Sequence, residues 1–336
     1  MLEIENYLYR KSKFSGVVSI EQKGKIIFEK AYGWADQEGQ IKNELSTKFS
    51  VGSLISKPIT AVCILQLVSK DLLSLNQDIA EYFPAFTGKG ITVLHLLNHT
   101  SGIVNYLMLR NKVKWDQDYS PEQILSIVEK EKLKFEAGAK SMYCNTGYLM
   151  LGLLIEMITS ISYEDYVRRN IFRIAQMNDS GFIRDDIDGV AQNYINGQIG
   201  QHVSPTLLFA CGEVVTTLED VRRFERALKR GLLLNQEYSN LMEQMSYKGK
   251  YVTIGHGWFI KNLFGHKSIC HPGNHPSGTT SHMERYMEDD LTIIVISNNV
   301  TSFSKLTIKE FSGTLLNREI ASILYGEKLH FYQKII

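Results

Sequence analysis

The stretch FSVGSLISKPITAVCILQLV, residues 49–68, contains the strongest structural signal in the chain. From Ile59 onward, apolar residues fall on nearly every side of a helix, which predicts a helix that is buried all round. Lys57 stands at the start of this helix, with Ser53 and Ser56 close by. Burial disfavours the charged form of an amine, so a buried lysine is suited to accept a proton from a serine hydroxyl. The alternative is a lysine whose side chain reaches from the helix start to solvent.

Length and composition predict a soluble globular protein with a large core. The chain has 336 residues, of which 44% are hydrophobic, enough for one large domain or two closely joined ones. Its 37 basic and 36 acidic residues are interspersed and give a formal net charge of +1, so no surface for nucleic acid is expected. The four cysteines are far apart and form no CxxC pair, which favours free thiols.

The first residues and the apolar runs do not predict a secretory signal or a membrane span. MLEIENYLYRKSKF includes Glu3 and has no apolar segment before a cleavage site, unlike a secretory signal. If Met1 is the natural start, we expect a cytoplasmic protein. The longest apolar run, residues 148–158, is interrupted by Glu156 and is too short to cross a bilayer.

Strand patterns stand near both ends of the chain, with helical patterns between them. Residues 16–36 predict a hairpin that turns at Lys23-Gly24, and residues 279–299 predict two strands around an acidic turn. A helical pattern follows over residues 304–326. Further helices are predicted by a capping box at Ser120, ahead of residues 123–135, and by a cap at Thr217, in a helix that ends before Gly231.

These patterns predict an α/β (α+β) fold, in which an antiparallel sheet is flanked by helices and an all-helical domain is inserted. We expect residues 1–70 and 206–336 to form the α/β domain, and residues 71–205 to form the inserted domain. Binding and catalytic sites favour such seams between domains, so the active site is expected there.

A second stretch, SMYCNTGYLMLGLLIEMI (residues 141–158), contains two polar side chains that would face the same way. Tyr143 and Asn145 alternate on a short extended or turn segment, whereas Cys144 would face away as a small core residue. A tyrosine buried beside a cation can act as a base, and an asparagine can hold both a lysine and a substrate amide. Taken alone, the stretch is also compatible with an ordinary core.

A third stretch, CHPGNHPSGTTSHMERY (residues 270–286), carries two of the chain's six prolines ahead of a predicted strand. Gly273 would let a substrate backbone approach the strand edge closely, and His271 could donate to a developing negative charge. The plainer interpretation is an exposed, proline-rich loop with incidental histidines.

Taken together, these segments resemble the serine β-lactamase and penicillin-binding protein superfamily, in particular its class C-like branch with DD-peptidases and esterases. Tyr143-Cys144-Asn145 matches the Y-x-N motif of that branch, and His271-Pro272-Gly273 matches the H-x-G that often replaces K-T-G. The likeness runs in order over nearly the whole chain, through residues 49–86, ITVLHLLNHTSGI (91–103), residues 143–167, ACGEVVTTLEDVRRF (210–224) and CHPGNHPSG (270–278).

The resemblance implies acyl transfer without a cofactor or a metal. A serine attacks a carbonyl, Lys57 activates it, Tyr143 acts as general base and acid, and Asn145 orients the groups. The backbone N–H groups of the serine and of Asn274 stabilise the oxyanion, while His271 and Gly273 line the strand edge. The expected substrate is an ester, an amide or a peptide with a small acyl group, and no nucleic acid or membrane span is involved.

The chain departs from the family at the nucleophile. The family serine lies three residues before the lysine, where this chain has Leu54, but the lead-in F-x-V-G-S aligns with Ser53, four residues before Lys57. Residues three and four apart share a helix face, and Pro58 removes the N–H that would bond the carbonyl of Leu54, which loosens this turn. Ser56 would point about 100° away from the lysine. We therefore expect Ser53 to be the nucleophile.

The displaced serine also supports a second hypothesis. A shift of about 1 Å in a catalytic group can cost on the order of a hundredfold in rate. The chain would then be a catalytically weakened or silent family member that binds a peptide or a cell-wall fragment in the same cleft.

Histidine patterns suggest metal sites only weakly. His95 and His99 have the i, i+4 spacing of an H-E-x-x-H helix, but Leu96 stands where the general base belongs, and the resemblance explains the stretch as a structural helix and turn. Histidines are also frequent in the C-terminal part, where no ligand spacing apart from Cys270 supports a metal site. These are His256, His266, His271, His275 and His282. We predict no metal.

Overall fold

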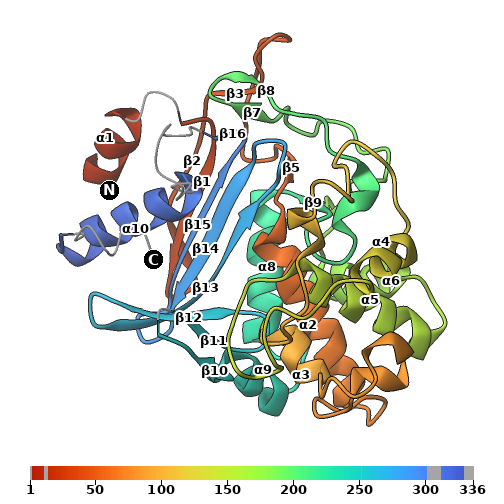
Figure 1. Cartoon of the computed structure of the whole chain (residues 1–336). Helices are drawn as coiled ribbons and strands as arrows, with labels where there is room; N and C mark the ends of the chain where they lie inside the picture. Colours follow the sequence, from red (N-terminus) through yellow and green to blue (C-terminus); the bar gives the residue numbers. More distant parts are fainter. Residues whose placement is uncertain (1, 11–13, 251, 301–311, 329–336) are drawn as a thin grey trace.

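The computed structural model describes residues 2–10, 14–250, 252–300 and 312–328 (Figure 1). An eight-stranded antiparallel sheet has the order β10-β11-β12-β13-β14-β15-β1-β2. Its strands are β1 (Gly16–Gln22), β2 (Lys25–Tyr32), β10 (Tyr247–Lys248), β11 (Thr253–Ile254), β12 (Phe259–Leu263), β13 (His266–Asn274), β14 (Thr280–Tyr286) and β15 (Leu291–Ser297). Strands from both ends of the sequence pair directly, because β1 lies beside β15 in the register Gly16↔Ser297.

The hairpin predicted at Lys23-Gly24 connects β1 and β2. Both turn residues have positive φ, 51° for Lys23 and 71° for Gly24, as a two-residue hairpin turn of matching twist requires. The two strands predicted from residues 279–299 are β14 and β15. Every residue of both strands is buried, which indicates that the centre of the sheet is covered on both faces.

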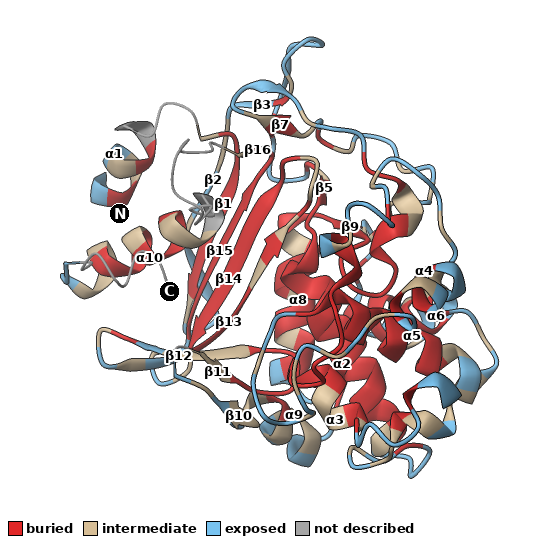
Figure 2. Ribbon diagram, in the orientation of Figure 1, coloured by how far each residue is buried: buried red, intermediate tan, exposed pale blue. Residues whose placement is uncertain are grey.

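Two helical layers cover the sheet (Figure 1). On one face lie α1 (Leu2–Arg10) and α10 (Ser312–Tyr325), whose buried residues form a core cluster with alternate residues of β1 and β15. On the other face lie α2 (Ser53–Val68) and α8 (Leu218–Lys229), in a larger core that contains the neighbouring residues of the same strands. Figure 2 shows the resulting continuous buried zone through the sheet and α2.

The remaining elements are mostly short helices. They include α3 (Val93–Leu97), α4 (Pro121–Val128), α5 (Asn145–Thr159), α6 (Tyr163–Val167), α7 (Arg173–Ala175) and α9 (Gln236–Glu243). Three small sheets accompany them: β5 (Phe49–Ser50) with β9 (Val214–Thr216) and β6 (Gly181–Phe182), β16 (Asn299–Val300) with β7 (Tyr194–Ile195) and β8 (Gln198–Ile199), and β3 (Trp34–Asp36) with β4 (Ile41–Lys42). Residues 71–205 thus contain short strands as well as helices, and the division into domains stays a prediction.

Two predicted helices have the expected beginnings but different extents. The capping box at Ser120 is present, since its hydroxyl accepts the N–H of Gln123, but α4 ends at Val128 instead of continuing to residue 135. Beyond the helix, the N–H of Lys134 bonds the carbonyl of Gly102, a contact across the fold that a longer helix would not make. Of the helix predicted over residues 304–326, the part before Ser312 lies outside the described residues.

The described helices are short relative to the thickness of a bilayer. None of them is by itself both long enough and apolar enough to cross a membrane, whereas one pair, Asn145–Thr159 with Tyr163–Ala175, meets the length and composition together but is bent by 80°.

Candidate active site

The first turn of α2 brings Ser53 and Lys57 into contact. The Nζ atom of Lys57 lies 2.9 Å from the Oγ atom of Ser53, so a separation of four residues places the two groups on one helix face, as expected. Leu54, which occupies the position of the family serine, is fully buried in the apolar core. The serine at residue 53, and not the side chain at residue 54, therefore meets the lysine.

Three oxygen atoms surround the ammonium group of Lys57, whose side chain is fully buried. They are Ser53 Oγ at 2.9 Å, the side-chain carbonyl of Asn145 at 2.6 Å and the main-chain carbonyl of Cys211 at 2.8 Å. The three acceptors match the three protons of an ammonium. If the lysine releases one proton, the hydroxyl of Ser53, which donates to the Cys211 carbonyl at 2.9 Å, can turn and donate to the amine instead.

Tyr143 contacts the same serine oxygen as Lys57. Its phenolic hydroxyl donates to Ser53 Oγ at 2.9 Å, and its side chain is 38% exposed, so it lies between the buried lysine and solvent. Asn145 begins α5 and points to Lys57, whereas the thiol of Cys144 points to the carbonyl of Ile103 and is buried. The expected alternation of these three side chains is present.

Ser56 does not share this arrangement. Its hydroxyl donates to the carbonyl of Gly52 at 2.7 Å and accepts the N–H of Val214 at 3.3 Å. Both contacts support the first turn of α2, and the side chain is fully buried.

The end of β13 forms an unpaired strand edge beside α2. β12 pairs with β13 only as far as Cys270, so among the described strands the last four residues of β13 have a neighbour on the β14 side alone. The N–H of His275 bonds the carbonyl of Thr279 in the turn to β14, and hydrogen bonds alternate along an antiparallel pair. The N–H of Asn274 therefore points away from β14, toward the unpaired edge. Pro272 stands at the same edge, where its missing N–H costs no ladder bond.

Two glycines allow this edge to lie against the helix. Gly52, with φ of 58°, precedes Ser53, and a Cβ atom there would lie 2.8 Å from the carbonyl carbon of Asn274. A Cβ atom on Gly273 would lie 2.2 Å from the carbonyl oxygen of Val51. Glycine at 273 is thus required by packing of the strand against α2, and its close approach to a substrate stays a prediction. The contact sets the Asn274 backbone beside the start of α2.

His271 differs in one respect from the expectation. Its ring is 1% exposed, and its Nδ1 atom lies 2.7 Å from the carbonyl oxygen of Pro272. A carbonyl only accepts, so Nδ1 must hold the proton. Burial lowers the pKa of His271 well below its usual range, and the charge of Lys57 lowers it further, so the ring is neutral. Its Nε2 atom is then an acceptor, and the ring is not the donor that the sequence suggested.

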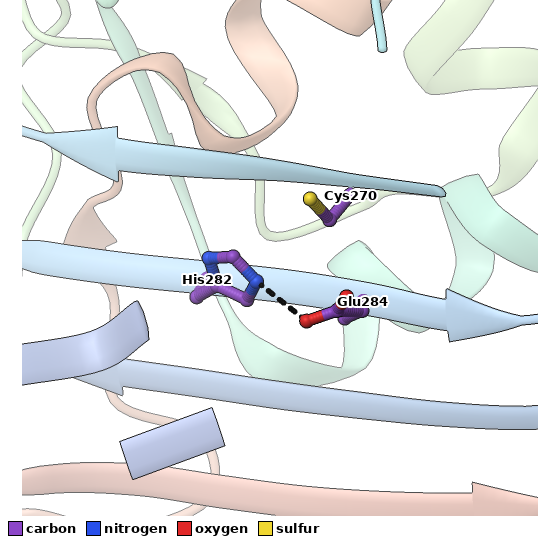
Figure 3. Close-up of side chains that lie close together, drawn as sticks. All are labelled: Cys270, His282 and Glu284. Atoms are coloured by element: carbon purple, nitrogen blue, oxygen red, sulfur yellow. Dashed lines mark hydrogen bonds and ion pairs between the residues drawn. The ribbon is translucent and has the colours of Figure 1, made fainter. Parts of the chain in front are cut away.

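A second buried polar cluster lies between β13 and β14 (Figure 3). Potential ligand atoms of Cys270, His282 and Glu284 all lie within 4.8 Å of one another, and His282 Nε2 is 3.2 Å from a Glu284 oxygen. These donor types suit zinc. However, the nearby charge of Lys261 acts to lower the pKa of all three side chains, and burial lowers the pKa of Lys261 in turn, so a further cation there would be repelled by this lysine.

His95 and His99 do not converge on a common point as zinc ligands would. The Nδ1 atom of His95 accepts the N–H of Thr92 at its own helix start, whereas the Nδ1 atom of His99 lies 3.3 Å from the N–H of Cys144.

Comparison with known proteins identifies the family to which the chain belongs. The family described as "Beta-lactamase" matches residues 4–310. The chain belongs to this family. It is 28% identical over 320 residues to penicillin-binding protein 4* of Bacillus subtilis, covering 87% of this chain and 69% of the relative. It is 24% identical over 325 residues to the teichoic acid D-alanine hydrolase of Staphylococcus aureus, covering 94% and 78% respectively.

The fold agrees with this assignment. The crystal structure of a penicillin-binding protein from Bacillus halodurans superposes with a TM-score of 0.81 at 26% identity, covering 95% of this chain and 98% of that one. The predicted α/β fold class and the predicted superfamily are confirmed, and the chain is a serine hydrolase of the β-lactamase-related type, acting on ester, amide or peptide bonds.

The sequence did not reveal the main-chain acceptor at Cys211. The segment that contains it, residues 210–224, was part of the resemblance. Every residue has a main-chain carbonyl, however, so the sequence does not show which one is used. Only the three-dimensional structure shows that the Cys211 carbonyl bonds both Ser53 and Lys57.

Proposed function

We propose that this enzyme hydrolyses esters or amides of small D-amino acids through an acyl-enzyme formed on Ser53. The observation that carries the proposal is that Ser53 Oγ lies 2.9 Å from both Lys57 Nζ and the hydroxyl oxygen of Tyr143. A serine held between two groups that can exchange protons is the arrangement that nucleophilic catalysis requires. The D-alanyl preference is supported by the name of the Staphylococcus aureus relative, which shares 24% of its residues over most of this chain.

In the first step, Tyr143 reacts as its phenolate: Ser53 Oγ bonds to the substrate carbonyl carbon while the serine proton passes to the phenolate oxygen, 2.9 Å away. Lys57, whose Nζ atom is 4.8 Å from the centre of the tyrosine ring, keeps a positive charge beside the group that gives and takes this proton. Asn145 holds the lysine in place through the 2.6 Å bond. Tyr143 then delivers the proton to the leaving alcohol or amine as the carbonyl–heteroatom bond breaks, which leaves the acyl group on Ser53.

The oxyanion forms between the start of α2 and the edge of β13. The N–H groups at the start of a helix have no partner within that helix, and the N–H of Asn274 points to the same edge. Together, the N–H groups of Ser53 and Asn274 stabilise the negative oxygen of each tetrahedral intermediate.

In the second step, a water attacks the carbonyl carbon of the acyl-enzyme and gives one proton to Tyr143. The bond to Ser53 Oγ then breaks, Tyr143 returns the proton to Ser53, and the acid is released.

Covalent labelling tests the nucleophile. The protein is incubated with a fluorophosphonate probe, and the adduct is located by peptide mass spectrometry. We expect one adduct on Ser53, lost in Ser53→Ala and kept in the matched control Ser56→Ala, because the hydroxyl of Ser56 is turned to Gly52 and Val214. An adduct on Ser56, or no adduct on a folded protein, would contradict the proposal and favour a silent member that only binds its ligand.

Paired substrates test the stereochemistry. Hydrolysis rates are compared for the 4-nitroanilides and methyl esters of D-alanine and L-alanine, with Ser53→Ala as the blank. We expect kcat/KM to be at least about tenfold higher for the D forms, because a site shaped for one enantiomer misplaces the carbonyl of the other. Equal rates, or a preference for the L forms, would leave the nucleophile in place but overturn the proposed substrate class.

A further inference from the structure

The segment that carries Tyr143 is held at two points by His99, a residue from another part of the chain. Residues 140–144 lie outside helices and strands, so no ladder fixes them. The N–H of Met142 bonds the main-chain carbonyl of His99 at 3.0 Å, and the N–H of Cys144 bonds the His99 ring at Nδ1, 3.3 Å away. The two residues that flank Tyr143 are therefore both fastened to His99.

The His99 ring also contacts Tyr143 itself. The centres of the two rings are 4.7 Å apart with an interplanar angle of 48°, and His99 is only 3% exposed. Phe259 is more distant, at 6.4 Å from Tyr143. The buried ring of His271 is also 6.4 Å from Tyr143, so of these three rings His99 is the one nearest to the partly exposed phenol.

The conformation and charge of His99 suit this task. The residue follows α3 with φ of 59°, a left-handed conformation that turns its carbonyl and its ring toward the same segment. Burial lowers the pKa of His99 to about 3, and the nearby charge of Lys57 contributes. The ring is therefore neutral at ordinary pH, and Nδ1 can accept the N–H of Cys144 while Nε2 holds the proton.

We propose that His99 is a positioning residue that aims the hydroxyl of Tyr143 at Ser53. This inference rests on the proposed role of Tyr143 in proton transfer. The histidine does not touch the reacting atoms, and it acts through the tyrosine alone. Because catalytic groups must be placed to within about 1 Å, loss of this support should lower kcat while leaving substrate binding nearly unchanged.

Three substitutions test whether His99 positions Tyr143 or only fills space in the core. His99→Asn keeps a side-chain oxygen close to the Nδ1 position and tolerates the left-handed conformation, but it removes the ring from Tyr143. His99→Ala removes both contacts. The control His256→Asn changes another buried histidine that bonds a main-chain carbonyl, that of Leu241 at 2.8 Å. Each protein is first compared by thermal unfolding.

We expect kcat for a D-alanyl ester to fall about tenfold in His99→Asn and about a hundredfold in His99→Ala, with KM changed less than about threefold. The amide of Cys144 should also exchange hydrogen faster in His99→Ala than in His99→Asn. The control His256→Asn should keep kcat within about twofold, even where its stability falls equally. Unchanged kcat in His99→Ala, or an equal fall in the control, would overturn the inference.

A double-mutant cycle with Tyr143→Phe gives the decisive comparison. If His99 acts through the phenol, His99→Ala should change the rate less than about twofold once the hydroxyl is gone. A full additional loss in the double variant would overturn the positioning role and leave the proposed function intact. Wild-type activity in Tyr143→Phe alone would instead refute the proposed role of the tyrosine, and with it this inference.

Discussion

Restoring the serine to its usual family spacing should not restore activity in this protein. In Ser53→Ala, hydrolysis should fall by at least about a thousandfold, because loss of a nucleophile removes the covalent route. Adding Leu54→Ser recreates a serine three residues before Lys57. Leu54, however, is fully buried in the apolar core, so the new hydroxyl would point into that core and away from the lysine.

The structure also sets the size of the accompanying loss of stability. Removing a fully buried leucine side chain costs about 2–5 kcal/mol, and a buried hydroxyl without a partner adds about 1–3 kcal/mol. The free energy of unfolding of Ser53→Ala/Leu54→Ser should therefore be about 3–8 kcal/mol lower than that of Ser53→Ala, and lower than that of the matched control Ser53→Ala/Leu54→Ala. Urea unfolding measures this difference at a temperature where all three variants are folded.

Hydrolysis of a D-alanyl ester and labelling by a fluorophosphonate are then measured on the same samples. We expect both double variants to stay inactive and unlabelled. Activity that returns with Leu54→Ser but not with Leu54→Ala, together with a label at that position, would refute the assignment. It would mean that the first turn of α2 presents residue 54, and not residue 53, to Lys57.

Three further changes follow from individual contacts. Lys57→Met should lower kcat by at least about a thousandfold, measured by ester hydrolysis, because Ser53 and Tyr143 lose their charged neighbour; activity within tenfold of wild type would contradict this. Gly273→Ala should reduce the free energy of unfolding by about 1–3 kcal/mol and kcat more than tenfold, because its Cβ atom would lie 2.2 Å from the carbonyl oxygen of Val51; wild-type unfolding and rate would show that the strand can move aside. Burial raises the pKa of Glu213 from 4.5 to about 7, so its neutral form stabilises the fold at low pH, and this contribution is lost as pH rises through 7. Urea unfolding should show that the free energy of unfolding of the wild type falls by about 3 kcal/mol between pH 4.5 and pH 8, relative to that of Glu213→Gln. If the difference between the two proteins did not change with pH, the raised pKa of Glu213 would be wrong.

Local signals in the sequence predicted several helices and turns of the fold correctly. The all-round apolar pattern after Lys57 predicted a buried helix, and α2 is buried from Ser53 to Leu67. The hairpin at Lys23-Gly24 and the cap at Ser120 also depend on neighbouring residues, and both are present. In each case the physical cause lies within a few positions of the residue concerned.

Features that depend on distant parts of the chain were less predictable. Lys134 lies beyond the end of α4 and bonds the carbonyl of Gly102, and the neutral ring of His271 follows from its burial against the strand edge. Glu284 joins Cys270 and His282 only because β13 and β14 pair in one particular register, Cys270↔Glu284. Periodicity within one segment carries no information about such contacts.

The bonds from the Cys211 carbonyl to Ser53 and Lys57 have an evolutionary consequence. Because the acceptor belongs to the main chain, replacing the cysteine side chain does not delete it, so this anchor tolerates sequence drift at its own position. The position of this carbonyl depends instead on the conformation of the turn that contains Cys211. The carboxyl group of Glu213 holds that turn by accepting the N–H of Ala210, a residue in left-handed conformation with φ of 54°. Inactivating substitutions should therefore concentrate around Ala210 and Glu213, whereas residue 211 is limited only by the space for its fully buried side chain, beside Tyr106 and Leu208.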